Sequence, residues 1–262
     1  MRFLRTIAVT FAQYSRIPVP RFDWEKEDMR YSMSVFPWVG AVIGACFVLV
    51  YRLSGTLGLP QLAVIALLTA VPLVITGGFH VDGFLDVEDA LSSWRSREDK
   101  LAILKDPHIG AFAVIRFALL GLIWLASLAV LVPGGASGGD PFLALGLGFF
   151  LSRALSAWTV LNFRPAKQDG MLAAEASSAS ERGALRTNQA LTTVWIMSAA
   201  GGMCRADLRT GLAVLAAQFL TLIWYNHFTS REFGGITGDT AGYFVTVSEC
   251  AMFAAAAVVS LL

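Results

Sequence analysis

The sequence predicts an all-α fold: a bundle of six or seven membrane-spanning helices, preceded by a helix that lies on the membrane surface. Of the 262 residues, 56% are hydrophobic and only 15% are charged, against roughly 25% charged residues in an average soluble domain. This composition excludes a soluble globular enzyme and a disordered chain. The net charge of +1 argues against a nucleic-acid partner, which would require a basic stripe. We interpret residues 1–262 as one membrane-embedded domain.

The N-terminal 14 residues carry apolar side chains at helical spacing. Phe3, Leu4, Ile7, Ala8 and Phe11 recur every one to four positions, on one side of a helix. This pattern predicts an amphipathic helix on a membrane surface or, equally, a helix packed on the rest of the protein. The Ile-Pro-Val-Pro run that follows ends the helix. No long apolar core or small-residue cleavage site indicates a signal peptide.

Seven apolar segments follow, most of them near the roughly 20 residues that a spanning helix needs. They cover residues 35–51, 61–79, 111–132, 142–162, 190–204, 210–228 and 241–262. The first and the fifth are short, so each is predicted as a full, partial or tilted insertion. The count therefore stays at six or seven, and its parity decides on which side of the membrane the C-terminus lies.

Basic residues between the segments predict the orientation of the bundle. With seven spans, the N-terminal region has six Lys and Arg, residues 80–110 and 163–189 have four each, and residues 229–240 have one. The opposite loops hold only Arg52, Arg205 and Arg209. By the positive-inside rule, the richer set of loops is cytoplasmic. This predicts a multi-pass protein of the bacterial inner membrane, with its chemistry at the cytoplasmic face, where most acidic residues also fall.

The strongest functional signal lies directly after the second segment. Asp82, Asp86 and Asp89 stand at i, i+4 and i+7, so they share one helix face. Like charges at this spacing repel by about 0.2–0.5 kcal/mol per pair, and a divalent cation would offset that repulsion. Oxygen ligands favour Mg²⁺, Mn²⁺ or Ca²⁺, and Mg²⁺ commonly binds carboxylates together with substrate phosphates. The alternative is a plain solvated acidic face. Glu88 lies off this face and is expected to be solvated.

Basic and polar residues further along complete a candidate phosphate site. Lys105 is the preferred phosphate contact after the acidic helix, and Asp106 either contacts substrate or begins the next helix. Arg153 lies within an apolar segment, where a charge faces a cavity or a partner. Substrate contact is favoured there over a structural ion pair. Arg164 ends the fourth segment on the same predicted side.

A glycine-rich turn near the C-terminus lies on the same predicted face. Glycines let the backbone approach a ligand and leave N–H groups free to hold phosphate. Thr237 and Gly238 are therefore expected to contact substrate, and Asp239 to join the aspartates as a metal ligand. Glu249, ten residues on, is expected to face the interior. The residues alone predict a membrane-embedded, divalent-metal-dependent enzyme that acts on a phosphorylated or diphosphate substrate.

Six sequence blocks, spread over nearly the whole chain, together resemble the cobalamin synthase family of adenosylcobinamide-GDP ribazoletransferases. They are IPVP at 17–20, FPWVG at 36–40, GFHVDG at 78–83 with Asp86 and Asp89, Lys105-Asp106 with Ile109-Gly110, Arg164-Pro165, and Thr237-Gly238-Asp239. The third block is fairly specific in combination with the Lys-Asp and Thr-Gly-Asp blocks, whereas no block is specific alone.

The resemblance implies an inner-membrane enzyme that uses Mg²⁺. Such an enzyme joins adenosylcobinamide-GDP to α-ribazole, or to α-ribazole 5′-phosphate, and releases GMP in the last assembly step of cobalamin biosynthesis. His80 is then a candidate base for the attacking hydroxyl, and so is one of the aspartates, Asp82. The remaining assignments are Asp82, Asp86, Asp89 and Asp239 to the metal and Lys105, Asp106, Arg153, Arg164, Thr237 and Gly238 to substrate.

One departure and two rival families bear on this prediction. The family has Ser-Arg where this chain has Pro107-His108, so how tightly this loop holds the substrate is left open. A CDP-alcohol phosphatidyltransferase would have wider aspartate spacing within an Asp-Gly-x-x-Ala-Arg run. A cation or corrin transporter would have polar groups at mid-span and an internal repeat. The oligomeric state, monomer or homo-oligomer, is also left open.

Overall fold

The fold is built from helices, as predicted. The computed structural model describes residues 2–20, 22–133, 139–166, 177–179 and 183–262, and every named element in these ranges is a helix. In chain order they are α1 (Arg2–Tyr14), the 3₁₀ helix η1 (Lys26–Met29), α2 (Ser32–Thr56), α3 (Gln61–Thr76), α4 (Phe79–Ser92), α5 (Arg97–Ile103), α6 (Ala111–Leu131), α7 (Pro141–Asn162), α9 (Ala184–Ala206), α10 (Leu208–Glu232) and α11 (Gly238–Ser260).

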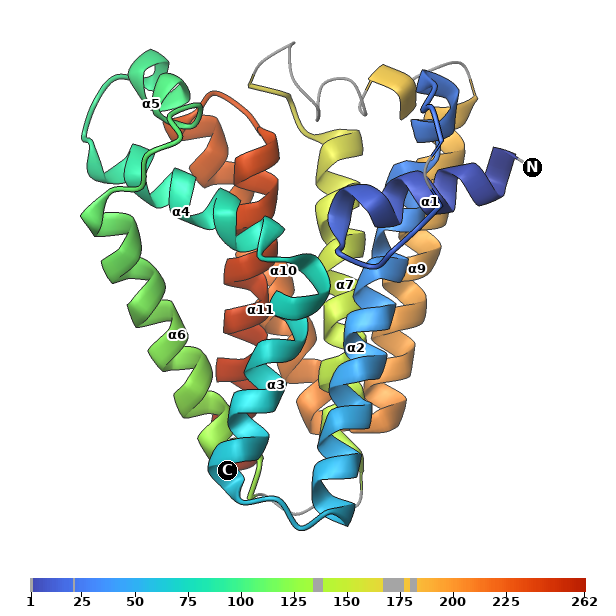
Figure 1. Ribbon diagram of the computed structural model, residues 1–262, viewed down its shortest axis with the longest axis vertical. Coiled ribbons are helices and arrows are strands. Elements are labelled where there is room, and N and C mark those ends of the chain that lie inside the picture. The colour runs from blue at the N-terminus through green and yellow to red at the C-terminus, as the bar shows by residue number, and fades with distance from the viewer. Residues whose placement is uncertain (1, 21, 134–138, 167–176, 180–182) are drawn as a thin grey trace.

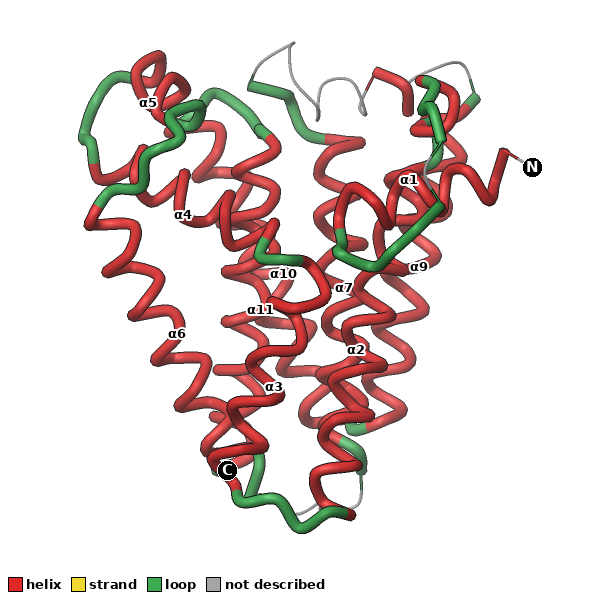
Figure 2. The backbone as a smooth tube through the Cα atoms, viewed as in Figure 1, coloured by secondary structure: helices red, strands yellow, loops and turns green. Residues whose placement is uncertain are grey.

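Long helices run between a wide and a narrow end of the molecule, while α1 and α4 lie across them near the wide end (Figure 1). The long helices are α2, α3, α6, α7, α9, α10 and α11. The N-terminus lies toward the wide end and the C-terminus at the narrow end. Figure 2 shows that α5 and its flanking loops lie at the wide end, whereas the connection from α2 to α3 lies at the narrow end. The wide end is therefore the end that carries the loops predicted to hold the chemistry.

The composition of these helices supports five or six membrane spans. Within the described ranges, α2, α6, α7, α10 and α11 are each long and apolar enough to cross a membrane, and α3 joins them only as a pair with α4, bent by 90°. The predicted fifth segment lies in α9, which has 23 residues but is not in this set. The difference from the predicted six or seven arises because α9 carries polar residues such as Arg186, Asn188 and Gln189 among its apolar ones.

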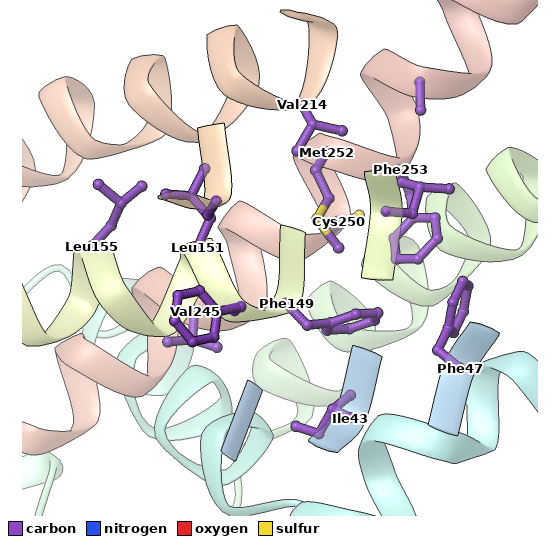
Figure 3. Close-up of a cluster of buried hydrophobic side chains, with 14 of the residues drawn as sticks. Ile43, Phe47, Phe149, Leu151, Leu155, Val214, Val245, Cys250, Met252 and Phe253 are labelled. Carbon is purple, nitrogen blue, oxygen red and sulfur yellow. The ribbon is translucent and has the colours of Figure 1, made fainter. Parts of the chain in front are cut away.

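Close packing at the centre joins α2, α7 and α11. The rings of Phe47, Phe149 and Phe253, one from each of these helices, have centroids 5.4 to 5.9 Å apart (Figure 3). Gly40 and Gly44 of α2 lie directly against the α7 backbone, where an added Cβ would clash. Because lipid tails are as apolar as these side chains, such close van der Waals packing holds membrane helices together.

The helix α1 packs on the rest of the protein, which is one of its two predicted placements. Thr6, Val9 and Thr10 are buried, and the Arg5 guanidinium binds the Asp28 carboxylate of η1 at 2.8 Å. On the other side, the large apolar side chains at positions 3 and 4 are 68% and 70% exposed. This helix therefore packs on the protein while it presents an apolar surface outward.

Both acidic residues of the narrow end act as helix caps. The Asp140 carboxylate accepts the N–H of Leu143 at 2.9 Å and the guanidinium of Arg52 at 2.6 Å. The Asp207 carboxylate accepts the N–H of Thr210 at 2.7 Å. These carboxylates satisfy backbone donors that a helix start leaves unpaired, so their interactions here are structural.

Candidate active site

The candidate site begins at a sharp bend between α3 and α4. Gly77 and Gly78 have φ angles of +64° and +82°, a left-handed conformation that glycine adopts without strain. They end α3 at Thr76, so the predicted extension of this segment to residue 79 is wrong. The two glycines turn the chain by 90°, and α4 leaves the direction of the spans. The aspartates of α4 consequently lie along a helix that runs across the wide end (Figure 1).

The start of α11 lies directly against the middle of α4. An added Cβ on Gly83 would lie 2.7 Å from the backbone carbonyl oxygen of Asp239. Thr237 caps α11: its hydroxyl accepts the N–H of Thr240 at 3.1 Å, and the Thr240 hydroxyl accepts the N–H of Thr237 at 2.8 Å. The structure thus brings the two acidic segments together, as the sequence predicted, because position 83 has no side chain.

Four carboxylates from these two segments influence one another. Burial, followed by the negative charges of Asp82, Asp239 and Asp89, raises the pKa of the Asp86 carboxyl to about 7. Asp82 is exposed, Asp86 and Asp239 are half-buried, and the half-buried Asp89 carboxylate accepts the backbone N–H of Gly110. The concentration of negative charge at Asp86 is the electrostatic signature of a site that a cation would stabilise.

The donor chemistry of this group fits a hard divalent cation, since it offers only carboxylate oxygens. In the conformation described, no three His, Cys, Asp or Glu side chains among the described residues are gathered closely enough to hold a metal ion. One oxygen donor is also engaged elsewhere, in the hydrogen bond from Gly110 to Asp89. The predicted magnesium site therefore stays a prediction. Its support is that the ligand atoms on offer are carboxylate oxygens, which are negatively charged.

Besides Arg116, whose Nε lies 3.9 Å from the Glu88 carboxylate, three exposed cations lie in segments that adjoin the acidic helix or the start of α11. Lys105 lies in the loop after α5, and Arg164 lies at the end of α7, where its carbonyl accepts the N–H of Ile236 at 2.9 Å. The third, Arg16, is a residue that sequence reasoning missed. Its side chain lies against Gly77 at the bend, and its backbone N–H donates to the carbonyl of Ile75 at 2.7 Å. The available signal was its position directly before the Ile-Pro-Val-Pro block.

His80 lies on the inner side of α4. Its ring is only 5% exposed and stacks on Tyr14 with 6.4 Å between centroids, and neither ring nitrogen has a hydrogen-bond partner among the described residues. Burial, and secondarily the charge of Arg153, holds the pKa of the imidazole well below its usual value. The hydroxyl of Thr246 donates to the His80 carbonyl at 3.0 Å and fixes this turn on α11. His80 is therefore a buried, neutral group.

Arg153 forms an ion pair with Glu249 in the interior. The two residues are 1% and 5% exposed, and the Ser152 hydroxyl donates to the same carboxylate at 3.0 Å. The guanidinium also donates to the carbonyl of Phe149 at 3.3 Å. The expectation that Glu249 faces the interior is confirmed. For Arg153 the structure shows the ion pair that was the less favoured alternative, while its predicted substrate contact stays a prediction.

One expectation for the acidic helix and one of the two alternatives for its following loop are wrong. Glu88 is not solvated: its side chain is 12% exposed and accepts the hydroxyl of Tyr243 at 3.1 Å, because the face beside the aspartates packs on α11. Asp106 does not begin a helix, since α6 starts at Ala111. Its carboxylate instead binds the backbone N–H of His108 at 3.0 Å and the ring Nδ1 at 2.6 Å. The substituted Pro107-His108 pair is thereby held in an exposed turn.

Comparison with known proteins agrees with these features. Residues 6–257 match the family described as cobalamin-5-phosphate synthase. An adenosylcobinamide-GDP ribazoletransferase of Lachnoclostridium phytofermentans is 36% identical over 99% of this chain and 95% of its own. Relatives with the same name from Geobacillus kaustophilus and Shewanella amazonensis are 31% and 30% identical, over 92% and 94% of this chain and 90% and 92% of theirs. No solved structure matches.

These matches favour a transferase of cobalamin biosynthesis over the phosphatidyltransferase and transporter alternatives. The family match spans every block on which the resemblance rests, and the relatives are covered almost from end to end. The chain belongs to the cobalamin-5-phosphate synthase family.

Proposed function

We propose that the chain is an adenosylcobinamide-GDP ribazoletransferase of the bacterial inner membrane, acting at its cytoplasmic face. A ribose hydroxyl of α-ribazole, or of α-ribazole 5′-phosphate, attacks the phosphorus bonded to cobinamide. The bond from that phosphorus to GMP breaks, GMP leaves, and the hydroxyl proton passes to a base. The observation that carries the proposal is the meeting of the α4 aspartates with Asp239 at the wide end of the bundle.

The carboxylates would hold Mg²⁺. Asp82 is exposed and Asp86 is half-buried, and both share a helix face with Asp89. Asp239 comes from the first turn of α11 and lies against the same stretch of α4. When bound, Mg²⁺ supplies positive charge that screens the diphosphate and stabilises the leaving phosphate. The protein contributes the fixed spacing of α4 and α11, which positions the two reacting groups.

The exposed cations would bind the phosphates. Lys105, Arg164 and Arg16 come from three separate parts of the chain, in segments that adjoin α4 or the start of α11. Arginine binds phosphate through paired N–H donors, whereas lysine provides a point charge. Thr237 and Gly238 would contribute to phosphate binding through the start of α11. The Thr237 hydroxyl caps this helix, and the exposed Gly238 is its first residue. The N-terminus of a helix favours an anion.

The base remains one of two candidates. Asp82 is exposed on the acidic face, where a hydroxyl activated for attack would bind. His80 is neutral and buried, but it lines a small cavity that reaches Gly238 and Gly242 of α11. Both groups are able to accept a proton, and Asp82 is the one in contact with solvent. The exposed apolar side chains of α1, Phe3 and Leu4, would contact membrane lipid.

Activity of the purified protein tests the proposal. In detergent, with adenosylcobinamide-GDP, α-ribazole phosphate and Mg²⁺, we expect GMP release and formation of the cobalamin product. Asp82→Asn and Asp239→Asn should each lower kcat/KM by about 100-fold or more, because a metal ligand contributes several kcal/mol to the transition state. Glu98→Gln is the matched control, since Glu98 is an exposed acid on α5 outside the acidic face.

Two results would contradict the proposal at different levels. Absence of both GMP and the cobalamin product would contradict the assignment of this reaction to the protein. Full activity of Asp82→Asn and Asp239→Asn would contradict only the proposed metal site. Full activity after removal of divalent cations with a chelator would contradict it as well.

A further inference from the structure

The short helix α5 lies against the segment that joins α10 to α11. This segment, residues 233–236, is called the α10–α11 turn below. Phe233 is 1% exposed and belongs to one apolar cluster with Leu104 and with Phe84 of α4. Leu101 of α5 packs against the same cluster. The turn therefore shares an apolar core with both the acidic helix and α5.

Arg97 of α5 binds the end of α10. Its guanidinium donates to the carbonyls of Ser230 and Arg231 at 3.3 and 3.1 Å. These carbonyls belong to the last turn of α10, where a helix leaves acceptors unpaired and where a cation favours the helix dipole. An added Cβ on Gly234 would lie 3.1 Å from Nη1 of Arg97. The same guanidinium therefore lies against the α10–α11 turn.

Lys100, one turn further along α5, forms an ion pair with Glu232, the last residue of α10. Its Nζ lies 2.5 Å from Oε2 of that carboxylate, and the two side chains are 12% and 23% exposed. The other oxygen of Glu232 lies 3.3 Å from Nε of Arg231, whose side chain is 75% exposed. Solvent screens an exposed pair more than a sheltered one, so Lys100 is the stronger partner of Glu232.

The α10–α11 turn itself holds two groups of the proposed site. The N–H of Ile236 donates to the carbonyl of Arg164 at 2.9 Å, and the carbonyl of Ile236 accepts the N–H of Ala166 at 2.8 Å. Gly235 lies directly against the Arg164 carbonyl, where an added Cβ would clash. Asp239 follows in the first turn of α11. The placement of Arg164 and Asp239 therefore depends on where this turn lies.

The other end of α5 leads into the loop that carries Lys105. The N–H of Lys105 donates to the carbonyl of Ala102 at 3.0 Å, so this loop begins as a continuation of α5. Further along, the N–H of Gly110 binds the carboxylate of Asp89 on α4. One short helix thus connects the two sides of the acidic site, although none of its own side chains is assigned to metal or phosphate.

We propose that Arg97 and Lys100 are positioning residues for the reaction and act through the α10–α11 turn. They hold the turn from the side of α5, and the turn holds Asp239 and Arg164 at the acidic helix. The inference rests on the proposed function, which gives those two groups their roles. A displacement of about 1 Å in a reacting group costs up to about 100-fold in rate, so a small shift of the turn would be visible in turnover.

Hydrogen–deuterium exchange tests the hold on the turn without any substrate. Arg97→Met and Lys100→Met each remove a cation and keep an apolar stem. In the purified full-length protein, amides of residues 233–240 should exchange at least about threefold faster than in the wild type, because the segment opens more readily. Arg95→Met is the matched control: it removes an exposed arginine two residues before Arg97 and should exchange as the wild type does.

Turnover separates positioning from general stability. Each variant should lower kcat/KM for GMP release about 10- to 100-fold and raise the Mg²⁺ concentration needed for half-maximal activity, because Asp239 is displaced. The melting temperature should fall by about 4 °C or less, since partly exposed pairs contribute little to global stability. A purely structural role would instead lower the melting temperature and leave the Mg²⁺ requirement of the folded fraction unchanged.

Exchange of the two charges provides the rescue. Lys100→Glu combined with Glu232→Lys restores an ion pair of opposite direction, and it should recover most of the exchange protection and most of kcat/KM. Glu232→Lys alone places two cations together and should behave like Lys100→Met.

The outcomes separate this inference from the proposed function. Unchanged exchange in residues 233–240, an unchanged kcat/KM in both Met variants, or a double variant no better than Lys100→Met would overturn the positioning role, even beside normal GMP release by the wild type. Absence of GMP release by the wild type would instead contradict the proposed function, and faster exchange in the Met variants would still show that α5 holds the turn.

Discussion

At the scale of single residues, the pair formed by Arg153 and Glu249 places two charges in the interior of the protein. Removing two charges from water has a penalty of several kcal/mol per ion, which mutual attraction and hydrogen bonds must offset. Here the Ser152 hydroxyl and the carbonyl of Phe149 provide the additional hydrogen bonds. A pair kept at such a cost inside a membrane bundle usually has a functional role.

Breaking this pair from one side should destabilise the protein strongly. Glu249→Leu leaves an uncompensated buried guanidinium, so we expect the free energy of unfolding to fall by about 3–5 kcal/mol. The double variant Arg153→Met, Glu249→Leu removes both charges and should recover most of that loss. Denaturant-induced unfolding in detergent measures both effects.

The same double variant tests the predicted substrate contact of Arg153. If the variant folds and loses GMP release, Arg153 acts on the substrate as well as on Glu249. Full GMP release by a folded double variant would reduce the role of Arg153 to the ion pair. Equal instability of the single and double variants would contradict the explanation by an unpaired charge.

At the scale of elements, the bend between α3 and α4 positions the site. Gly78 has φ +82° and open space where a Cβ would lie, whereas Gly77 has φ +64° and lies against Arg16. Gly78→Ala should therefore cost about 1–2 kcal/mol from backbone strain alone. Gly77→Ala should cost more, because the added methyl group also displaces the Arg16 side chain.

Thermal unfolding of these variants in detergent checks the prediction. Gly55→Ala, at a position in α2 with ordinary φ and open space, is the control and should be neutral or slightly stabilising. Equal stability of Gly77→Ala and Gly78→Ala would contradict the proposed contact with Arg16. A loss at Gly55 as large as at the bend would contradict the explanation by left-handed backbone.

The sequence allowed the local part of this arrangement to be predicted. Spacing of i, i+4 and i+7 was sufficient to place Asp82, Asp86 and Asp89 on one face, because it depends only on helix geometry. The contact of Gly83 with Asp239 and that of Arg16 with Gly77 join distant parts of the chain. Nothing in the local pattern encodes such tertiary contacts, although the order of the blocks placed Asp239 on the correct end.

The errors have the same origin. Glu88 was expected in solvent because it lies off the aspartate face, but α11 covers the neighbouring face and Tyr243 binds its carboxylate. The sequence analysis kept an ion pair of Arg153 as an alternative but did not name Glu249 as the partner, since the two come from different helices. Periodicity predicts on which face of a helix a residue lies. Only the packing of the helices shows which residues that face contacts.

At the scale of the whole molecule, the two ends of the bundle have different roles. The wide end carries the acidic helix, the exposed cations and the longer loops (Figure 2). At the narrow end, Asp140 and Asp207 are engaged in helix caps. If the wide end is cytoplasmic, as the positive-inside rule predicts, substrates reach the site from the cytoplasm.

Labelling of single cysteines tests this orientation. In a variant with Cys46, Cys204 and Cys250 replaced by alanine, Glu98→Cys marks the wide end and Leu57→Cys marks the narrow end. A membrane-impermeant maleimide should label position 57 in intact spheroplasts and position 98 only after permeabilisation. The reverse pattern would place the acidic helix outside the cell, and GMP release by each variant serves as the control for folding.

The joint between α9 and α10 bears on how the chain is inserted during synthesis. Asp207 alone separates Ala206, the last residue of α9, from Leu208, the first of α10. α10 is apolar enough to enter lipid by itself, while α9 is not in that set. With a single linking residue the two cannot partition independently, so we expect α10 to take α9 into the bilayer with it as one hairpin. A nascent chain arrested at residue 206 would lack α10, and we expect its α9 to remain in the translocon or outside the lipid.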